Sequence, residues 1–182
     1  MNFIKKTDDR PYLIAEIGIN HNGDLGVAKK LMDAVHACGW DCAKFQKREP
    51  DICVPEDQKQ VPRETPWGEM TYLEYKHKIE FNENQIKELV QYSKNIGIDF
   101  FASVWDKDSV DVMAKYCKIG KIGSAIITDL ELCKYARNKF DFLIISTGMS
   151  TEKEIEECIN ICYPDVIMHT NSTYPCPVED LN

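Results

Sequence analysis

Polar and charged side chains recur at the ends of the strands that this sequence predicts. They are Glu16 and Asn20, Lys44 and Gln46, Ser103, Lys121 and Ser124, Ser146, then Ser172 and Tyr174. Two lysines and several hydroxyls in one place suit an anion such as a phosphate or a carboxylate, held in part by backbone N–H groups at turns. The chemistry therefore depends on whether the fold brings these strand ends together.

Each of these residues also has a structural interpretation. Lys44 could be a buried ion-pair partner of Glu16, and Lys121 could lie at a sheet edge. Single hydroxyls such as those of Ser103 and Ser146 often satisfy local backbone groups. The four histidines show no spacing of the H-x-x-x-H kind, so their spacing indicates no metal site.

The strand that carries Glu16 organises the chain. Residues 13–19 are apolar enough to be buried on both faces, yet they contain this acid and lead into the polar turn 20–23. The two-residue alternation of a strand places Glu16 on one face with Ile14 and Gly18. It likewise places Lys44 and Gln46 together on one face of strand 42–47.

Strands and helices alternate along the sequence at about thirty residues per unit. The predicted strands are 13–19, 42–47, 99–105, 117–124, 140–147 and 165–171. The predicted helices are 24–38, 82–97, 106–116, 128–138 and 151–162, with N-caps at Asp24, Asn82, Asp106, Thr128 and Thr151. The long segment 48–79 interrupts this rhythm with four prolines and room for one short helix, and insertions of this length are usually functional loops or lids.

This alternation predicts an α/β protein with a parallel sheet. The NHNG turn after the first strand is not G-x-G-x-x-G, which favours a (β/α)8 TIM-type barrel over a doubly wound sheet. In such a barrel all the strand ends open onto one rim, where active sites lie. Six units are present and a closed barrel needs eight, so residues 1–182 are expected to be an incomplete barrel domain.

Composition limits the partners and the compartment. A net charge of −8 argues against binding to nucleic acid, and no apolar run approaches the length of a membrane span. The N-terminal segment lacks the apolar stretch of a secretory signal. Eight cysteines without C-x-x-C pairs fit reduced thiols, so a cytoplasmic location is expected.

Six ordered strings give the chain a family resemblance: AEIGINHNG, KFQ, RETPWGEMTYLEYKH, KIGS, ISTGMST and STYPCPVEDLN. Together they resemble the sialic acid synthase family, which includes N-acetylneuraminate, legionaminate and pseudaminate synthases. The resemblance implies an eight-stranded barrel followed by a small antifreeze-like domain, in a homodimer. It implies condensation of phosphoenolpyruvate with an N-acetylated hexose aldehyde such as N-acetylmannosamine, with release of phosphate, and a bound Mn²⁺ or Mg²⁺.

The resemblance also implies roles for particular residues. Glu16 and Gln46 fall where the family contacts the sugar or metal-bound water. The positions that hold phosphoenolpyruvate in the family correspond to Lys44, Ser103, Lys121, Ser124, Ser146, Ser172 and Tyr174. Glu16, Lys44 and Gln46 are the expected catalytic residues, and the metal ligands are expected beyond Asn182.

Two other functions stay open at this point. One is a Schiff-base aldolase on a similar barrel, with Lys44 or Lys121 as the amine. The other is a non-catalytic ligand-binding or assembly subunit that keeps the anion site. The 182-residue chain alone is expected to be inactive and poorly soluble, because an incomplete barrel leaves strand edges open.

Overall fold

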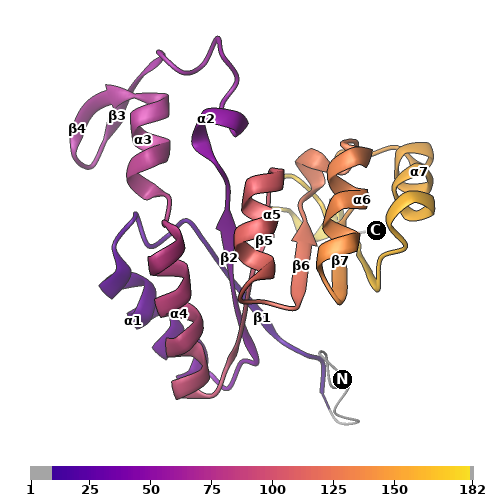
Figure 1. Ribbon diagram of the computed structural model, residues 1–182, viewed down its shortest axis with the longest axis horizontal. Coiled ribbons are helices and arrows are strands. Elements are labelled where there is room, and N and C mark those ends of the chain that lie inside the picture. Colours follow the sequence, from indigo (N-terminus) through magenta and orange to yellow (C-terminus); the bar gives the residue numbers. More distant parts are fainter. Residues whose placement is uncertain (1–9, 181–182) are drawn as a thin grey trace.

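The computed structural model describes residues 10–180 as a parallel sheet covered by helices on one face (Figure 1). Residues 1–9, which form most of the N-terminal segment expected to lack a secretory signal, and the last two residues of the predicted C-terminal loop lie outside the described part. The sheet has the order β1-β2-β5-β6-β7-β8, and all its pairings are parallel. Its strands are β1 (Ile14–Gly18), β2 (Cys42–Lys47), β5 (Asp99–Val104), β6 (Ile119–Ile122), β7 (Phe142–Ser146) and β8 (Val166–Met168).

The helices between these strands begin at side-chain caps, as predicted in all but one case. They are α1 (Leu25–Ala37), α4 (Glu83–Ile96), α5 (Lys107–Ala114), α6 (Leu130–Lys139) and α7 (Glu152–Cys162). The exception is α6, which the sequence predicts to begin at Thr128. The Asp129 carboxylate accepts the hydrogen bond from Leu132 N instead, because the short 3-10 helix Ser124–Ile126 carries the chain one residue further before α6 starts.

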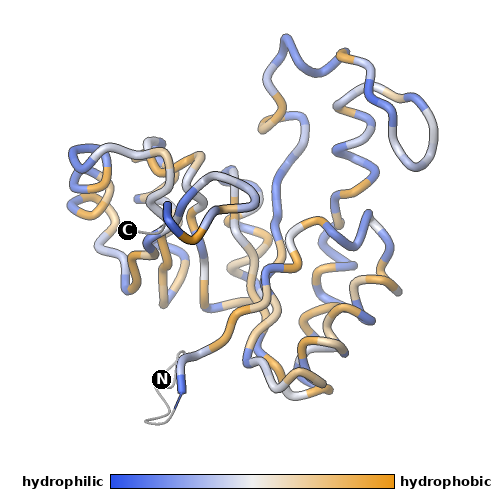
Figure 2. The backbone as a smooth tube through the Cα atoms, turned by 180° about the vertical axis from the view of Figure 1, so that it is seen from behind, coloured by the Kyte–Doolittle hydropathy of each residue, from blue (hydrophilic) through white to orange (hydrophobic). Residues whose placement is uncertain are grey.

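The insertion after β2 contains more structure than the sequence predicts. It holds α2 (Pro50–Cys53), the antiparallel hairpin β3 (Pro62–Thr65) and β4 (Gly68–Thr71), and α3 (Tyr72–Ile79). The hairpin was missed because its prolines and exposed strands lack the apolar alternation of a buried strand. Figure 1 shows the insertion projecting beyond the end of the sheet, and its tip is hydrophilic in Figure 2.

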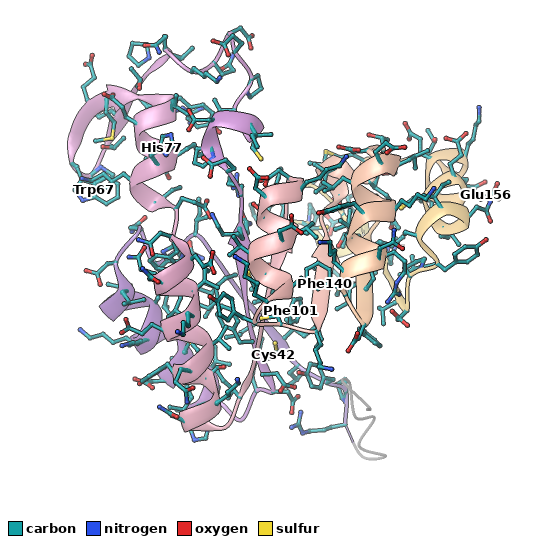
Figure 3. The ribbon with its side chains drawn as sticks, viewed as in Figure 1. Cys42, Trp67, His77, Phe101, Phe140 and Glu156 are labelled. Carbon is teal, nitrogen blue, oxygen red and sulfur yellow. The ribbon has the colours of Figure 1, made fainter. Side chains whose placement is uncertain are left out.

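The two faces of the sheet have different coverings. Side chains such as Ala43, Phe45 and Phe100 pack with the helices in the main core. The opposite face carries a smaller apolar cluster around Cys42 and Phe101, which are labelled in Figure 3. Alternation places this cluster at the amino ends of the strands and Lys44, Gln46 and their neighbours at the carboxyl ends.

The six strands form a half-barrel, which confirms the fold class. β1 and β8 are its two edges, since each pairs with a neighbour on one side only. Within residues 10–180, no helix combines the length and the apolarity needed to cross a lipid bilayer.

His21 anchors the turn that follows β1. Its ring is buried, stacks on Phe81 with centroids 4.1 Å apart, and accepts a hydrogen bond at Nδ1 from Gly23 N at 3.0 Å. Burial lowers the pKa of His21 to about 4, so the imidazole is neutral at pH 7. This histidine is therefore a structural residue that shapes the turn beside Glu16.

Candidate functional site

The structure brings all nine predicted site residues together around one cavity of about 610 Å³. The cavity lies over the carboxyl ends of the sheet strands and the loops that follow them. The predicted residues among those that line it are Glu16, Lys44, Gln46, Ser103, Lys121, Ser124, Ser146, Ser172 and Tyr174. A rim built from several separate strands is the arrangement in which barrel enzymes place their active sites.

Strand register explains how residues far apart in sequence become neighbours. Glu16 pairs with Lys44 across β1 and β2. One row further along, Gln46 pairs with Ser103, and Ser103 pairs with Lys121. These side chains share the face away from the helices, so a parallel sheet sets their relative positions without any loop rearrangement.

Lys44 is the central cation of the cavity. Its Nζ lies 2.5 Å from Glu16 Oε2 and donates a hydrogen bond to Ser103 Oγ at 3.0 Å. Lys44 is 5% exposed, whereas the Glu16 side chain is 55% exposed. Lys44 is thus an ion-pair partner of Glu16, as its structural interpretation predicts. Both residues of the pair also line the cavity.

Lys121 supplies a second, less compensated cation. It is buried, and within residues 10–180 it has no hydrogen-bond acceptor and no carboxylate within 4.0 Å of its ammonium group. Burial, and then repulsion from Lys44, lowers its pKa to about 8 while Glu16 opposes the shift. An anion placed between the two lysines would relieve this cost, so the electrostatics favour a negatively charged ligand.

Hydroxyls surround the glycine turn after β7. Gly148 N donates to Ser124 Oγ at 3.0 Å and to Thr170 Oγ1 at 2.7 Å. A Cβ at Gly148 would lie 2.4 Å from Ser172 Oγ, so only glycine leaves room for these hydroxyls to converge. With the Gly148 N–H held by two of them, the three hydroxyls gathered at this turn are donors suited to a phosphate or carboxylate.

Two buried polar atoms of lining residues lack partners. Among residues 10–180, Ser146 Oγ and Trp105 Nε1 have no hydrogen bond, although buried polar groups are nearly always paired. Both residues line the cavity. A bound ligand or ordered water is the natural partner for such groups.

Sequence reasoning missed three lining residues with polar side chains. Thr170 and Asn171 lie in the loop after β8, and Trp105 follows β5. The rule that polar groups at strand ends meet at one rim could have found Thr170 and Asn171. Trp105 carried no such signal, because an aromatic residue at a strand end is equally typical of a core. Of the predicted residues, Tyr174 stands apart at 92% exposure, at the mouth of the cavity.

The cavity does not by itself fit a divalent metal ion. Among the described residues that line it, Glu16 is the single carboxylate, it is paired with Lys44, and there is no histidine. A Mg²⁺ or Mn²⁺ site needs several oxygen or nitrogen ligands of its own. The one grouping in residues 10–180 with suitable ligand atoms is Glu49, Asp51 and His77 of the insertion, which all lie within 4.8 Å of one another. It lies outside the cavity, and the His77 imidazole already contacts Asp51 at 3.0 Å.

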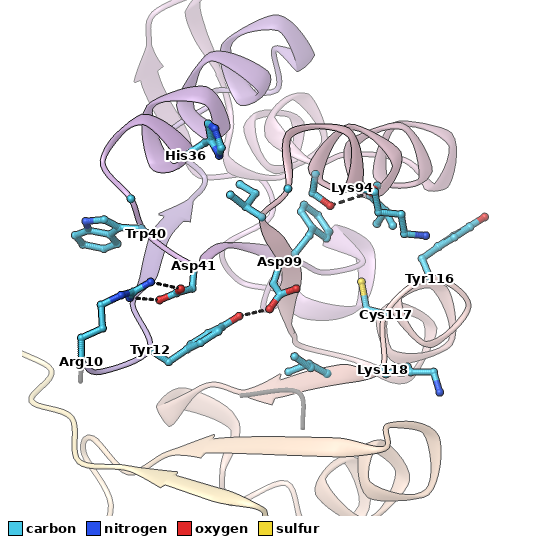
Figure 4. Close-up of a pocket in the computed structure, with 17 residues that line it drawn as sticks. Arg10, Tyr12, His36, Trp40, Asp41, Lys94, Asp99, Tyr116, Cys117 and Lys118 are labelled. Carbon is cyan, nitrogen blue, oxygen red and sulfur yellow. Dashed lines mark hydrogen bonds and ion pairs between the residues drawn. The ribbon is translucent and has the colours of Figure 1, made fainter. Parts of the chain in front are cut away.

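A second cavity, of about 780 Å³, lies at the opposite ends of the strands (Figure 4). Arg10 donates to both carboxylate oxygens of Asp41, and Tyr12 donates to Asp99 at 2.5 Å. These pairs satisfy their members, and none of the predicted site residues lies there. The residues predicted from the sequence therefore line the carboxyl-end cavity and not this one.

Comparison with known proteins identifies relatives of this chain. The chain is 33% identical over 180 residues to N,N'-diacetyllegionaminic acid synthase of Campylobacter jejuni, covering 93% of this chain and 54% of that protein. It is 34% identical over 178 residues to human N-acetylneuraminate-9-phosphate synthase, covering 94% of this chain and 49% of that protein. It thus spans about half the length of the curated relatives it matches.

A solved structure matches to a similar extent. The crystal structure of N-acetylneuraminic acid synthetase from Leptospira borgpetersenii, in complex with citrate, superposes with a TM-score of 0.82 at 25% identity. The match covers 94% of this chain and 57% of that one. The sequence profile described as the NeuB family matches residues 31–182, most of the chain. The chain therefore belongs to the NeuB family.

Proposed function

We propose that this chain forms the phosphoenolpyruvate-binding part of a synthase that condenses phosphoenolpyruvate with an N-acetylated hexose aldehyde to a nine-carbon sialic-type acid. The observation that carries the proposal is the pair of buried cations, Lys44 and Lys121, in one cavity with hydroxyls that converge at Gly148 and with the Ser146 hydroxyl, which is unpaired within residues 10–180. Phosphoenolpyruvate carries both a phosphate and a carboxylate, so it needs several cations and hydroxyls within one pocket.

The proposed roles follow from positions. Lys44 and Lys121 neutralise the enol phosphate, and Ser103 is held by Lys44 so that its oxygen faces the same region. The remaining donors to the phosphate and carboxylate are Ser124, Ser146, Ser172 and Tyr174. Holding the ligand in one orientation before the acceptor arrives removes much of the entropy cost of the bimolecular step.

In the proposed reaction C3 of phosphoenolpyruvate forms a bond to the aldehyde carbon, and the aldehyde oxygen takes up a proton. Water then adds at C2, and the tetrahedral intermediate expels phosphate. Glu16 is half exposed to the cavity and stays next to a cation, so it is placed to orient that water and accept its proton. Gln46 lies beside Glu16 and would contact the acceptor.

Other parts of the whole protein are also proposals. The resemblance implies two more barrel units and an antifreeze-like domain, with the ligands of a Mn²⁺ or Mg²⁺ ion outside the described residues. The unpaired edges of β1 and β8 support further elements or a second subunit beside this sheet. A homodimer and a cytoplasmic location are proposed on the same resemblance, and eight free cysteines fit a reducing compartment.

A phosphate-release assay tests the proposal. Phosphoenolpyruvate is supplied with N-acetylmannosamine or a 2,4-diacetamido-trideoxyhexose and Mn²⁺, to the 182-residue chain and to the longest protein that its gene encodes. Sugar-dependent release of phosphate supports the synthase and identifies its acceptor. Binding of phosphoenolpyruvate without turnover by either protein would support the non-catalytic subunit instead.

One observation favours a second candidate, the Schiff-base aldolase. The lowered pKa of Lys121, about 8, leaves part of its amine unprotonated near neutral pH. The amine would attack a substrate carbonyl and lose water to form an imine. Borohydride reduction that traps a substrate on Lys121 would support this candidate, and intact protein mass without an adduct would exclude it.

A further inference from the structure

Arg48 contacts two residues of the cavity wall from behind. It follows β2 directly and is 8% exposed. Its Nη2 donates a hydrogen bond to Gln46 Oε1, and its guanidinium carbon lies 4.4 Å from the centroid of the Trp105 ring. Gln46 and Trp105 line the carboxyl-end cavity, whereas Arg48 does not. Arg48 therefore acts on the cavity only through these two neighbours.

The contact with Arg48 fixes which end of the Gln46 carboxamide faces the ligand. A guanidinium group has donors and no acceptor, so it must hold the amide oxygen. The amide nitrogen then lies on the other side, where a Cβ built at Gly18 would be 3.6 Å from Gln46 Nε2 and 3.3 Å from Glu16 Oε1. Gln46 thus presents a hydrogen-bond donor next to Glu16.

Glu80 holds the backbone of Arg48 and forms an ion pair with its guanidinium group, although Arg48 Nε has no hydrogen bond within residues 10–180. Glu80 Oε1 accepts from Arg48 N at 3.1 Å and from Lys47 Nζ at 3.3 Å, and Glu80 Oε2 lies 3.8 Å from Arg48 Nε. Lys47 Nζ also donates to the carbonyl oxygen of Arg48 at 2.9 Å. Burial raises the pKa of Glu80, while Lys47 and Arg48 oppose that shift. Glu80 is the C-cap of α3, so the end of the insertion is tied to the end of β2.

We propose that Arg48 is a positioning residue: it locks the Gln46 carboxamide with its nitrogen toward the cavity and supports the Trp105 indole as the wall. The site then selects a ligand group that accepts a hydrogen bond beside Glu16. That this group is an oxygen of the acceptor sugar rests on the proposed function, whereas the locking of Gln46 does not.

The chain offers a matched pair of variants. R48M and K47M each remove one cation from Glu80, but only R48M removes the partner of Gln46. The readout is the order parameter of the Gln46 side-chain N–H groups from ¹⁵N relaxation, assigned by their disappearance in Q46A. The order parameter is expected to stay high in the wild type and in K47M, and to fall below about 0.6, the flexible range, in R48M.

An order parameter that stays high in R48M, or that falls equally in K47M, would overturn the proposal. If R48M does not fold, R48K gives the same comparison. An ammonium group has no plane to stack on Trp105 and no fixed donor direction toward the carboxamide, so mobility at Gln46 should rise there too.

Kinetics of the full-length enzyme separate this proposal from the proposed function. R48M should raise the KM for the acceptor about three- to tenfold, which is the effect expected from the loss of one hydrogen bond. The KM for phosphoenolpyruvate should change less than about twofold. A rigid Gln46 amide in a wild type that turns over no sugar would contradict the synthase and leave the positioning role standing. Equal changes in both KM values would contradict selection of the acceptor by Gln46.

Discussion

The Lys44 ammonium lies 2.5 Å from the Glu16 carboxylate, yet Lys44 is buried and Glu16 is half exposed to the cavity. The pair therefore joins an interior cation to a carboxylate that a ligand can reach. Removing the two partners should have different effects, because an exposed carboxylate is easily hydrated and a buried ammonium is not.

Replacing Glu16 with glutamine tests the role of that carboxylate. E16Q removes the negative charge that competes with an anion for Lys44, so affinity for phosphoenolpyruvate should stay within about threefold of the wild type or increase. Turnover should fall about 100-fold or more, because the water loses its base. Calorimetry and phosphate release measure the two quantities separately. Parallel losses in affinity and turnover would show that Glu16 serves mainly to orient Lys44.

Protonation of Lys121 predicts a pH dependence of binding. Its pKa is about 8 in the free protein, and a bound anion favours the charged form, so binding takes up a proton near that pH. Affinity for phosphoenolpyruvate should fall as pH rises through about 8, by at most about tenfold per pH unit. Titrations between about pH 7 and about pH 9 check this for the wild type and K121M. A slope that persists in K121M would assign the proton to another group.

Features of the fold that depend on local sequence were predicted correctly. Alternation along β2 correctly placed Lys44 and Gln46 on one face, and the capping boxes at Asn82 and Thr151 form as predicted. These features depend on a few neighbouring residues, so local patterns suffice. The cavity residues lie together because parallel strands place their carboxyl ends at one edge, and this rule could be applied from sequence alone.

Features that depend on contacts distant in sequence were missed. Thr170 bonds Gly148 and Ser124 only because β8 lies beside β7, and Arg48 meets Trp105 only because β2 lies beside β5. The N-cap of α6 was misplaced by one residue, since Thr128 and Asp129 are both good caps and the preceding turn decides between them.

Gly148 should tolerate no side chain. In G148A the new Cβ would lie 2.4 Å from Ser172 Oγ and displace the hydroxyls around the turn. We expect a loss of about 1–3 kcal/mol in the free energy of unfolding, together with weaker binding of phosphoenolpyruvate. Urea denaturation and calorimetry measure these effects.

Gly123 is the matched control for this substitution. A Cβ there meets nothing within 4 Å, and its φ of −77° suits any residue. G123A should therefore keep the wild-type free energy of unfolding to within about 0.5 kcal/mol. Equal losses in G123A and G148A would mean that crowding around Gly148 is not the cause.

His21 predicts sensitivity to acid. Its pKa is about 4 in the folded protein and about 6.5 when unfolded, so between these values the unfolded chain binds more protons and stability falls as pH falls. The contribution lost between about pH 7 and about pH 5 is on the order of 2 kcal/mol. Urea denaturation at both pH values measures it. In H21N, whose side-chain oxygen can replace Nδ1 as the acceptor for Gly23 N, this loss should be smaller, and an unchanged loss would exclude His21 as its source.

Calorimetric titration of phosphoenolpyruvate into this chain tests the central claim most directly. The cavity with Lys44 and Lys121 predicts one binding site that is lost in the K44M/K121M double variant. It also predicts unchanged binding in K118M, which removes an exposed lysine at the opposite cavity. Binding that survives in K44M/K121M, or a folded wild-type chain that binds no phosphoenolpyruvate, would contradict the account.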